Sequence, residues 1–193
     1  MSTSLASGML WSTIGRICQQ LVAIVATLLL ARLISPSAFG LVAMPTIFIG
    51  FATLIADFGF GASLVQQQDA VDDDLSTIFT TNLLIGIFLF ILFYVSSPYI
   101  ASFYRTPELQ DVTRILSLNF IAIGITVVPA ALLSRGMDFR SRAIADIVSV
   151  IAGALLALAL AALGAGVWSL VAQTTSTNLI RGIILWLRCP ANP

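Results

Sequence analysis

Polar side chains recur at helical spacing along the first long apolar segment of the chain, residues 8–34. Arg16, Gln19 and Gln20 are set among Leu, Ile and Val residues, and Ser12 and Thr27 continue the line at helical spacing. At about 100° per residue these positions share one helix face about 100° wide. A guanidinium on such a face could bind the oxygens of a phosphate group. Alternatively, Arg16 extends its charge to the lipid headgroups, and the sequence leaves both interpretations open.

Two later segments carry further polar side chains that could contact a substrate. Asp57, in residues 38–65, could hold a cation or a proton, or pair with Arg16. Asp57 could instead shape the glycine-rich end of residues 38–65. This second interpretation is favoured, because it requires less burial of charge. Gln173 and Arg181, in residues 167–187, form a third polar face, where extension to the headgroups is again the alternative for Arg181.

Most catalytic and metal chemistries are excluded by the residue types present. The chain has no His, which removes the usual proton switch and the commonest metal ligand. All nine basic residues are Arg and form no basic run, so no nucleic-acid surface is expected. No phosphate loop is present, and Cys18 and Cys189 are predicted to be free thiols. We therefore expect no catalytic residue, metal or cofactor, and a protein that is not an enzyme.

The composition is that of a membrane protein. Hydrophobic residues make up 59% of the 193 and charged residues only 9%, against about 25% charged in soluble domains. We predict an all-α fold, a polytopic membrane bundle of six transmembrane helices, with residues 1–7 as a cytoplasmic tail and 189–193 as a C-terminal tail or truncation point. The six predicted helices cover residues 8–34, 38–65, 75–96, 107–133, 143–163 and 167–187.

Proline and glycine mark the predicted breaks between helices. Pro36 disfavours helix at the residue before it, and Pro98 is expected to end the third helix. Thr106, Pro107 and Glu108 form a helix-start signature, and Gly164 and Gly166 predict a tight turn.

The orientation follows from arginine in short loops. Six spans place both termini on the same side. One set of helix ends carries five arginines and the other set carries three, which places both termini in the cytoplasm. The first set is Arg135, Arg140, Arg142, Arg181 and Arg188, and the second is Arg32, Arg105 and Arg114.

Several motifs resemble those of the oligosaccharide flippases of the polysaccharide transporter family, within the multidrug/oligosaccharidyl-lipid/polysaccharide exporter superfamily. The second segment ends in Ile55-Ala-Asp57-Phe-Gly59-Phe-Gly61, and Phe39-Gly40 opens it. The stretches around Arg105-Thr-Pro107-Glu, Arg135-Gly-Met-Asp138-Phe-Arg140 and Gly164-Ala-Gly166-Val-Trp168 are similar to the same group.

The resemblance implies a bacterial inner-membrane protein that flips a polyisoprenyl-diphosphate-linked oligosaccharide to the periplasmic leaflet. Members resemble two six-helix lobes around a central cavity, so this chain is expected to be the amino-terminal lobe. The implied partners are the lipid-linked oligosaccharide, membrane lipids, a second lobe or a dimer partner, and polysaccharide synthesis enzymes. In relatives an arginine early in the first helix can face the cavity, and Arg16 occupies a comparable place.

Two other functions compete with this one. A multidrug or cation antiporter of the same superfamily would use Asp57 as its ionisable group, although Arg16 in the first helix favours an anionic substrate. A non-transporting scaffold for synthesis enzymes, or an inactive remnant, would need neither residue.

Overall fold

The chain is all-helical in the computed structural model, which describes residues 2–50, 72–135 and 139–189. No strand occurs in these ranges, and the all-α membrane bundle expected from the sequence is confirmed. The helices are α1 (Ser2–Leu33), a helix over Pro36–Gly50, α3 (Asp72–Phe103), α4 (Leu109–Arg135), α5 (Phe139–Ala162) and α6 (Val167–Arg188).

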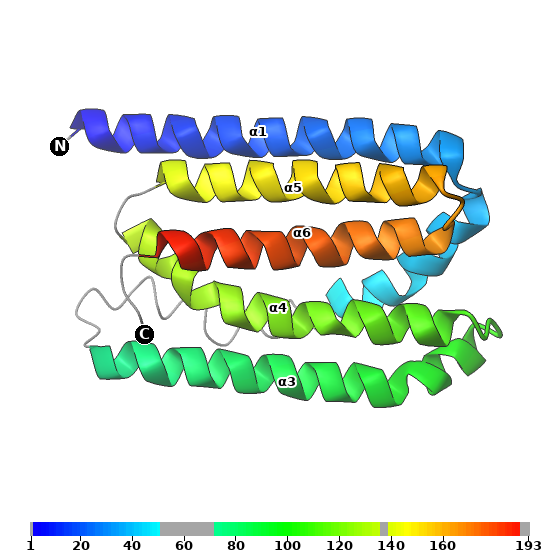
Figure 1. Ribbon diagram of the computed structural model, residues 1–193. Helices are drawn as coiled ribbons and strands as arrows, with labels where there is room; N and C mark the ends of the chain where they lie inside the picture. The colour runs from blue at the N-terminus through cyan, green and yellow to red at the C-terminus, as the bar shows by residue number, and fades with distance from the viewer. Residues whose placement is uncertain (1, 51–71, 136–138, 190–193) are drawn as a thin grey trace.

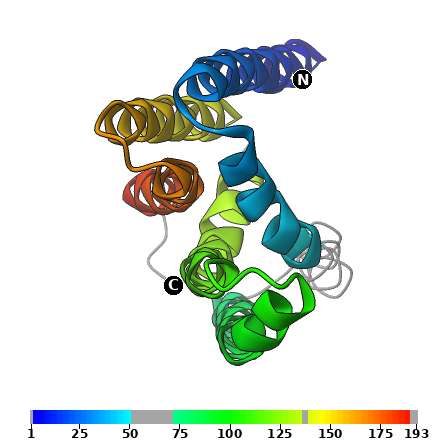
Figure 2. The same cartoon turned by 90° about the vertical axis from the view of Figure 1, so that its right-hand side faces the viewer.

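The five labelled helices lie side by side along a common direction, and α1 begins at the same end of the bundle where α6 ends (Figure 1). Viewed end-on they form a curved row in the order α1, α5, α6, α4, α3 (Figure 2). The Pro36–Gly50 helix lies on one side of this row, which we call the inner face (Figure 2). Its Val42 packs against two buried clusters, one containing Leu30 of α1 and one containing Leu116 of α4.

Four described helices contain a segment long and apolar enough to cross a membrane. Large apolar side chains cover the outside of the molecule; Leu28, Phe88 and Leu155, for example, are all more than 60% exposed. Such exposure is expected where lipid, rather than water, surrounds the helices. The chain is therefore a multi-pass membrane protein. The segments are Gly15–Leu33, Phe79–Phe103, Leu109–Leu133 and Arg140–Ala162.

Glycines allow the neighbouring helices of the row to approach closely. A Cβ atom added at Gly86 of α3 would lie 2.7 Å from the carbonyl oxygen of Phe120 on α4, and one added at Gly124 of α4 would lie 2.9 Å from that of Asn82. A Cβ at Gly153 of α5 would lie 3.0 Å from the carbonyl oxygen of Gln173 on α6. Small residues at such contacts are typical of packed membrane helices.

α3 differs from its predicted end because it continues through Pro98 to Phe103. Proline has no N–H, so the carbonyl of Tyr94, four residues earlier, lacks its usual helical donor. The hydroxyl of Ser97 donates to that carbonyl oxygen at 2.8 Å. The side chain replaces the missing hydrogen bond, and the helix continues.

The other helix ends follow local turn chemistry more closely. α1 ends at Leu33 and the next helix begins at Pro36, and Gly164 and Gly166 have φ angles of +81° and +56° in the turn between α5 and α6. α4 begins at Leu109 rather than at Pro107, because Leu109 N–H closes a tight turn by donating to the Thr106 carbonyl. α1 begins at Ser2, so the residues predicted as a tail are helical from that point.

Candidate functional site

α1 packs on α5 along one line of contact, with an apolar surface of α1 on one side of this line and a polar surface on the other. A Cβ added at Gly15 would lie 2.8 Å from the Ala143 side chain, and Ala26 is buried in the same contact. Val25 and Leu29, on one side of it, line an apolar groove between α1 and α5. This flank is suited to lipid tails.

The opposite flank of α1 carries the polar residues that the sequence singled out. Arg16, Gln20 and Thr27 are exposed, and the Thr27 hydroxyl donates to the Ala23 carbonyl. Arg16 and Ile34 are eighteen residues apart, about five full helical turns, and Ile34 N–H still bonds in helical fashion to the Leu30 carbonyl. Arg16 therefore lies on the same side of α1 as Ile34.

That side is the inner face. Ile34 is buried in a cluster with Ala38, the third residue of the Pro36–Gly50 helix, and Phe39 packs against the same cluster. Within the described residues no carboxylate forms an ion pair with Arg16. The structure thus places an exposed guanidinium on the inner face of an apolar helix.

Arg181 lies on the inner face of α6 but is paired. Its Nε donates to Oδ1 of Asp146 on α5 at 2.7 Å, with the two side chains 33% and 20% exposed. Val167 lies fourteen residues before Arg181, so the two residues are only about 40° apart around α6. Val167 packs against the same buried cluster as Phe39 and Val42 of the inner-face helix. Arg16 and Arg181 therefore face the same side of the row, and Asp146 neutralises one of them.

The remaining predicted site residues have different positions. Gln19 is half-buried, next to the contact of α1 with α5. Gln173 is half-buried at the contact of α6 with α5, where its carbonyl approaches Gly153. Asp57 lies outside the described residues. The substrate-binding roles of all six residues stay predictions.

Two polar contacts join α4 to α6, and both lie within the membrane-spanning part of α4. Asn178 donates from Nδ2 to Oδ1 of Asn119 at 2.9 Å, and Trp186 donates from its indole nitrogen to the carbonyl oxygen of Ile125 at 3.1 Å. Asn119 thus joins α4 to α6 through its side chain. Buried polar pairs of this kind stabilise helix packing by about 1 kcal/mol or less.

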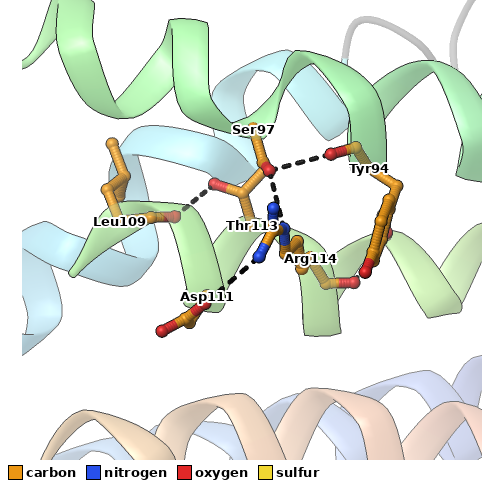
Figure 3. Close-up of polar contacts among 7 residues, drawn as sticks. Tyr94, Ser97, Leu109, Asp111, Thr113 and Arg114 are labelled. Carbon is orange, nitrogen blue, oxygen red and sulfur yellow. Dashed lines mark hydrogen bonds and ion pairs between the residues drawn. The ribbon is translucent and has the colours of Figure 1, made fainter. Parts of the chain in front are cut away.

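The sequence reasoning missed a polar cluster around Arg114 (Figure 3). It lies where α3 ends and α4 begins, at the end of the bundle opposite to the start of α1 (Figure 1). Arg114 of α4 donates from Nε to the hydroxyl of Ser97 at 3.2 Å, and its guanidinium lies 5.0 Å from the centre of the Tyr94 ring. Asp111 lies 3.7 Å from its NH1 atom. The spacing of Asp111 and Arg114, three residues apart on a helix, was the available signal.

No group of three or more potential metal-ligating residues occurs in the parts of the chain that the structure describes. Cys18 and Cys189 are free thiols, as predicted. What the inner face offers is therefore cationic and amide groups on packed helices, an arrangement suited to binding an anion.

Comparison with known families shows the sequence family of the chain. The sequence model of the family described as "Polysaccharide biosynthesis protein" matches residues 29–193. The chain belongs to this family. The resemblance inferred from the motifs is thereby confirmed at the level of the family. The comparison with solved structures gives no significant match.

The similar curated proteins of this family are longer than the chain. The teichuronic acid biosynthesis protein TuaB of Bacillus subtilis is 34% identical over 187 residues, which are 96% of the chain and 38% of the relative. The succinoglycan biosynthesis transport protein ExoT of Rhizobium meliloti is 34% identical over 154 residues, 79% of the chain and 31% of the relative. The lipopolysaccharide biosynthesis protein WzxC of Escherichia coli is 27% identical over 147 residues, 76% of the chain and 30% of the relative.

Proposed function

We propose that the chain forms one six-helix lobe of a transporter that flips a polyisoprenyl-diphosphate-linked oligosaccharide across a bacterial inner membrane, for the synthesis of a surface polysaccharide. The second lobe would come from a longer chain or from a partner. In support, the chain spans 38% of the length of TuaB, and one relative is named as a transport protein. No covalent step is part of this function.

The observation that carries the proposal is the exposed Arg16 on the inner face. A guanidinium in an otherwise apolar helix is costly unless it is paired or solvated, and such residues usually serve function. Its planar N–H groups match the oxygens of a diphosphate, with which a guanidinium can form two parallel hydrogen bonds. Gln20, one turn further along α1, is also exposed and could donate to the first sugar.

Arg181 would contribute less charge than Arg16, because Asp146 already accepts from it at 2.7 Å. We therefore assign the leading contact with the diphosphate to Arg16 and a supporting role to Arg181. Gln19, Gln173 and Asp57 complete the proposed substrate-binding set.

The proposed orientation places both termini in the cytoplasm. Five arginines belong to the end of the bundle where α1 begins, and three belong to the opposite end (Figure 1). The five are Arg135, Arg140, Arg142, Arg181 and Arg188, and the three are Arg32, Arg105 and Arg114. An excess of arginine in short cytoplasmic loops supports this assignment. Arg16 would then lie nearer the cytoplasmic leaflet, where the lipid-linked oligosaccharide is made.

The test is deletion of the gene for the full-length protein in a bacterium that makes a surface polysaccharide. Surface polymer should be lost, and the lipid-linked oligosaccharide should accumulate with its sugars inaccessible to an impermeant lectin added to spheroplasts. Restoring the gene should reverse both effects.

Two outcomes would contradict the proposal. Unchanged polymer with increased sensitivity to dyes or drugs would favour an antiporter. Lost polymer with the lipid-linked oligosaccharide on the outer surface, accessible to the lectin, would favour a scaffold that acts after translocation.

A further inference from the structure

A cavity of about 370 Å³ opens between α3, α4 and α6 at the proposed periplasmic end of the bundle. Its lining combines aromatic, aliphatic and charged side chains: Phe90, Tyr94, Asp111, Arg114, Leu118 and Trp168. The proposed function uses none of these residues. Their chemistry suits a ligand with one charged end and one apolar end.

The charged end of the cavity is the ion pair between Arg114 and Asp111, and both side chains are partly exposed. Arg114 and Asp111 are 34% and 66% exposed, and 3.7 Å separates their nearest charged atoms. A guanidinium has five N–H groups. Ser97 accepts from Nε at 3.2 Å. The Gln110 amide oxygen, once its amide is turned over, accepts from NH2 at 2.8 Å and from NH1 at 3.2 Å, so it uses two of the four N–H groups on these nitrogens. The buried hydroxyl of Ser97 thus fixes Arg114 while leaving other donors for a ligand.

The cavity lies at headgroup level on the lipid-facing side of the bundle. Trp168 and Trp186 are eighteen residues apart, so they lie on the same side of α6, about 27 Å apart along its axis. Tryptophans with this separation mark the two interfaces of a bilayer. Between them Leu179 and Ile183 are more than 50% exposed. Trp168 and the cavity beside it therefore meet the headgroups of one leaflet.

We propose that this cavity binds a zwitterionic aminophospholipid, phosphatidylethanolamine. Its phosphate would accept from Arg114, its ammonium group would donate to Asp111, and its acyl chains would lie on Phe90 and Leu118. A neutral pair of opposite charges complements this headgroup, because both its charges then have partners.

Other lipids fit these groups less well. Phosphatidylglycerol has a phosphate but no cation for Asp111. A choline group has no N–H to donate to a carboxylate. The face of the Tyr94 ring, which could otherwise hold a quaternary ammonium, lies against the Arg114 guanidinium.

The test measures quenching of Trp168 fluorescence by brominated lipids. The full chain is reconstituted in phosphatidylcholine vesicles that contain brominated phosphatidylethanolamine, phosphatidylglycerol or phosphatidylcholine. The difference between the chain and its Trp168→Phe variant isolates the signal of Trp168. We expect phosphatidylethanolamine to bind at Trp168 about fivefold more tightly than either other lipid.

Two variants identify the charges responsible. Arg114→Gln should abolish the preference for phosphatidylethanolamine over phosphatidylcholine. Asp111→Asn, at a side chain that is 66% exposed, should reverse the preference between phosphatidylethanolamine and phosphatidylglycerol. Arg32→Gln, at the same end of the bundle but outside the cavity, is the matched control and should leave all three affinities unchanged.

Equal quenching by the three lipids in the unmodified chain would overturn the proposal. So would a preference for phosphatidylethanolamine that persists in Asp111→Asn. A preference for phosphatidylglycerol in the unmodified chain would instead mean a site for anionic lipids, and would equally overturn it.

Discussion

The indole N–H of Trp186 on α6 donates to the carbonyl oxygen of Ile125 on α4 at 3.1 Å. Ile125 lies four residues before Pro129, which has no N–H to bond that carbonyl within the helix. Ser97 plays the same part in α3, where its hydroxyl reaches the carbonyl of Tyr94, four residues before Pro98. In both helices a side chain replaces the hydrogen bond that proline removes from the helix.

Trp186→Phe should destabilise the contact between α4 and α6. The phenyl ring would keep much of the edge-on contact with Phe79, but it has no N–H for the Ile125 carbonyl. An unsatisfied buried carbonyl costs about 1–3 kcal/mol, so the melting temperature of the detergent-solubilised chain should fall by several degrees. Trp168→Phe, at an exposed indole, should melt like the unmodified chain. Equal melting temperatures for both variants would contradict this account of Pro129.

The ion pair between Arg181 and Asp146 should contribute to the stability of the lobe. Arg181→Gln and Asp146→Asn should each cost about 1.5–3 kcal/mol, because the partner left behind is mostly buried. The double variant should cost less than the sum of the two, and thermal melts of all four chains give the coupling energy. Arg188→Gln, which removes an exposed contact with Ser141, is the control and should change stability by less than about 0.5 kcal/mol. Additive costs would mean that the pair is not coupled.

Gly153→Ala and Gly40→Ala should have opposite effects on stability. A Cβ at position 153 would collide with the Thr177 side chain and crowd the Gln173 carbonyl, so α5 and α6 would have to separate at a cost of about 1–3 kcal/mol. A Cβ at position 40 meets nothing within 4 Å, and replacing a helical glycine there should stabilise the chain by about 0.5–1 kcal/mol. The same thermal melts check both changes, and an unchanged or raised melting temperature for Gly153→Ala would contradict the close approach of α5 and α6.

Features that depend on neighbouring residues could be predicted from the sequence. Pro36 and the two glycines of the turn at 164–166 separate helices because their backbone restrictions act locally. The spacing of Arg16, Gln20 and Thr27 correctly predicted that they lie on one side of α1, because helical periodicity alone decides which residues share a face.

Features that depend on the packing of distant helices could not be predicted. Arg181 and Asp146 are 35 residues apart, and periodicity indicates the faces of two helices without indicating that they meet. Pro98 was expected to end a helix, and only the position of the Ser97 hydroxyl explains why it does not. Arg114 was assigned only to one set of helix ends, whereas its contacts with Ser97 and Tyr94 come from the packing of α3 on α4.

The central claim is that Arg16 binds the diphosphate of the transported lipid. The most direct test is Arg16→Ala in a full-length family member, with Arg32→Ala, an exposed arginine at the other end of the same helix, as the control. At normal protein levels, Arg16→Ala should lower polymer export by about tenfold or more, the loss expected when one charge-assisted contact is removed, while Arg32→Ala exports normally. Normal export by Arg16→Ala at a normal protein level would contradict the claim.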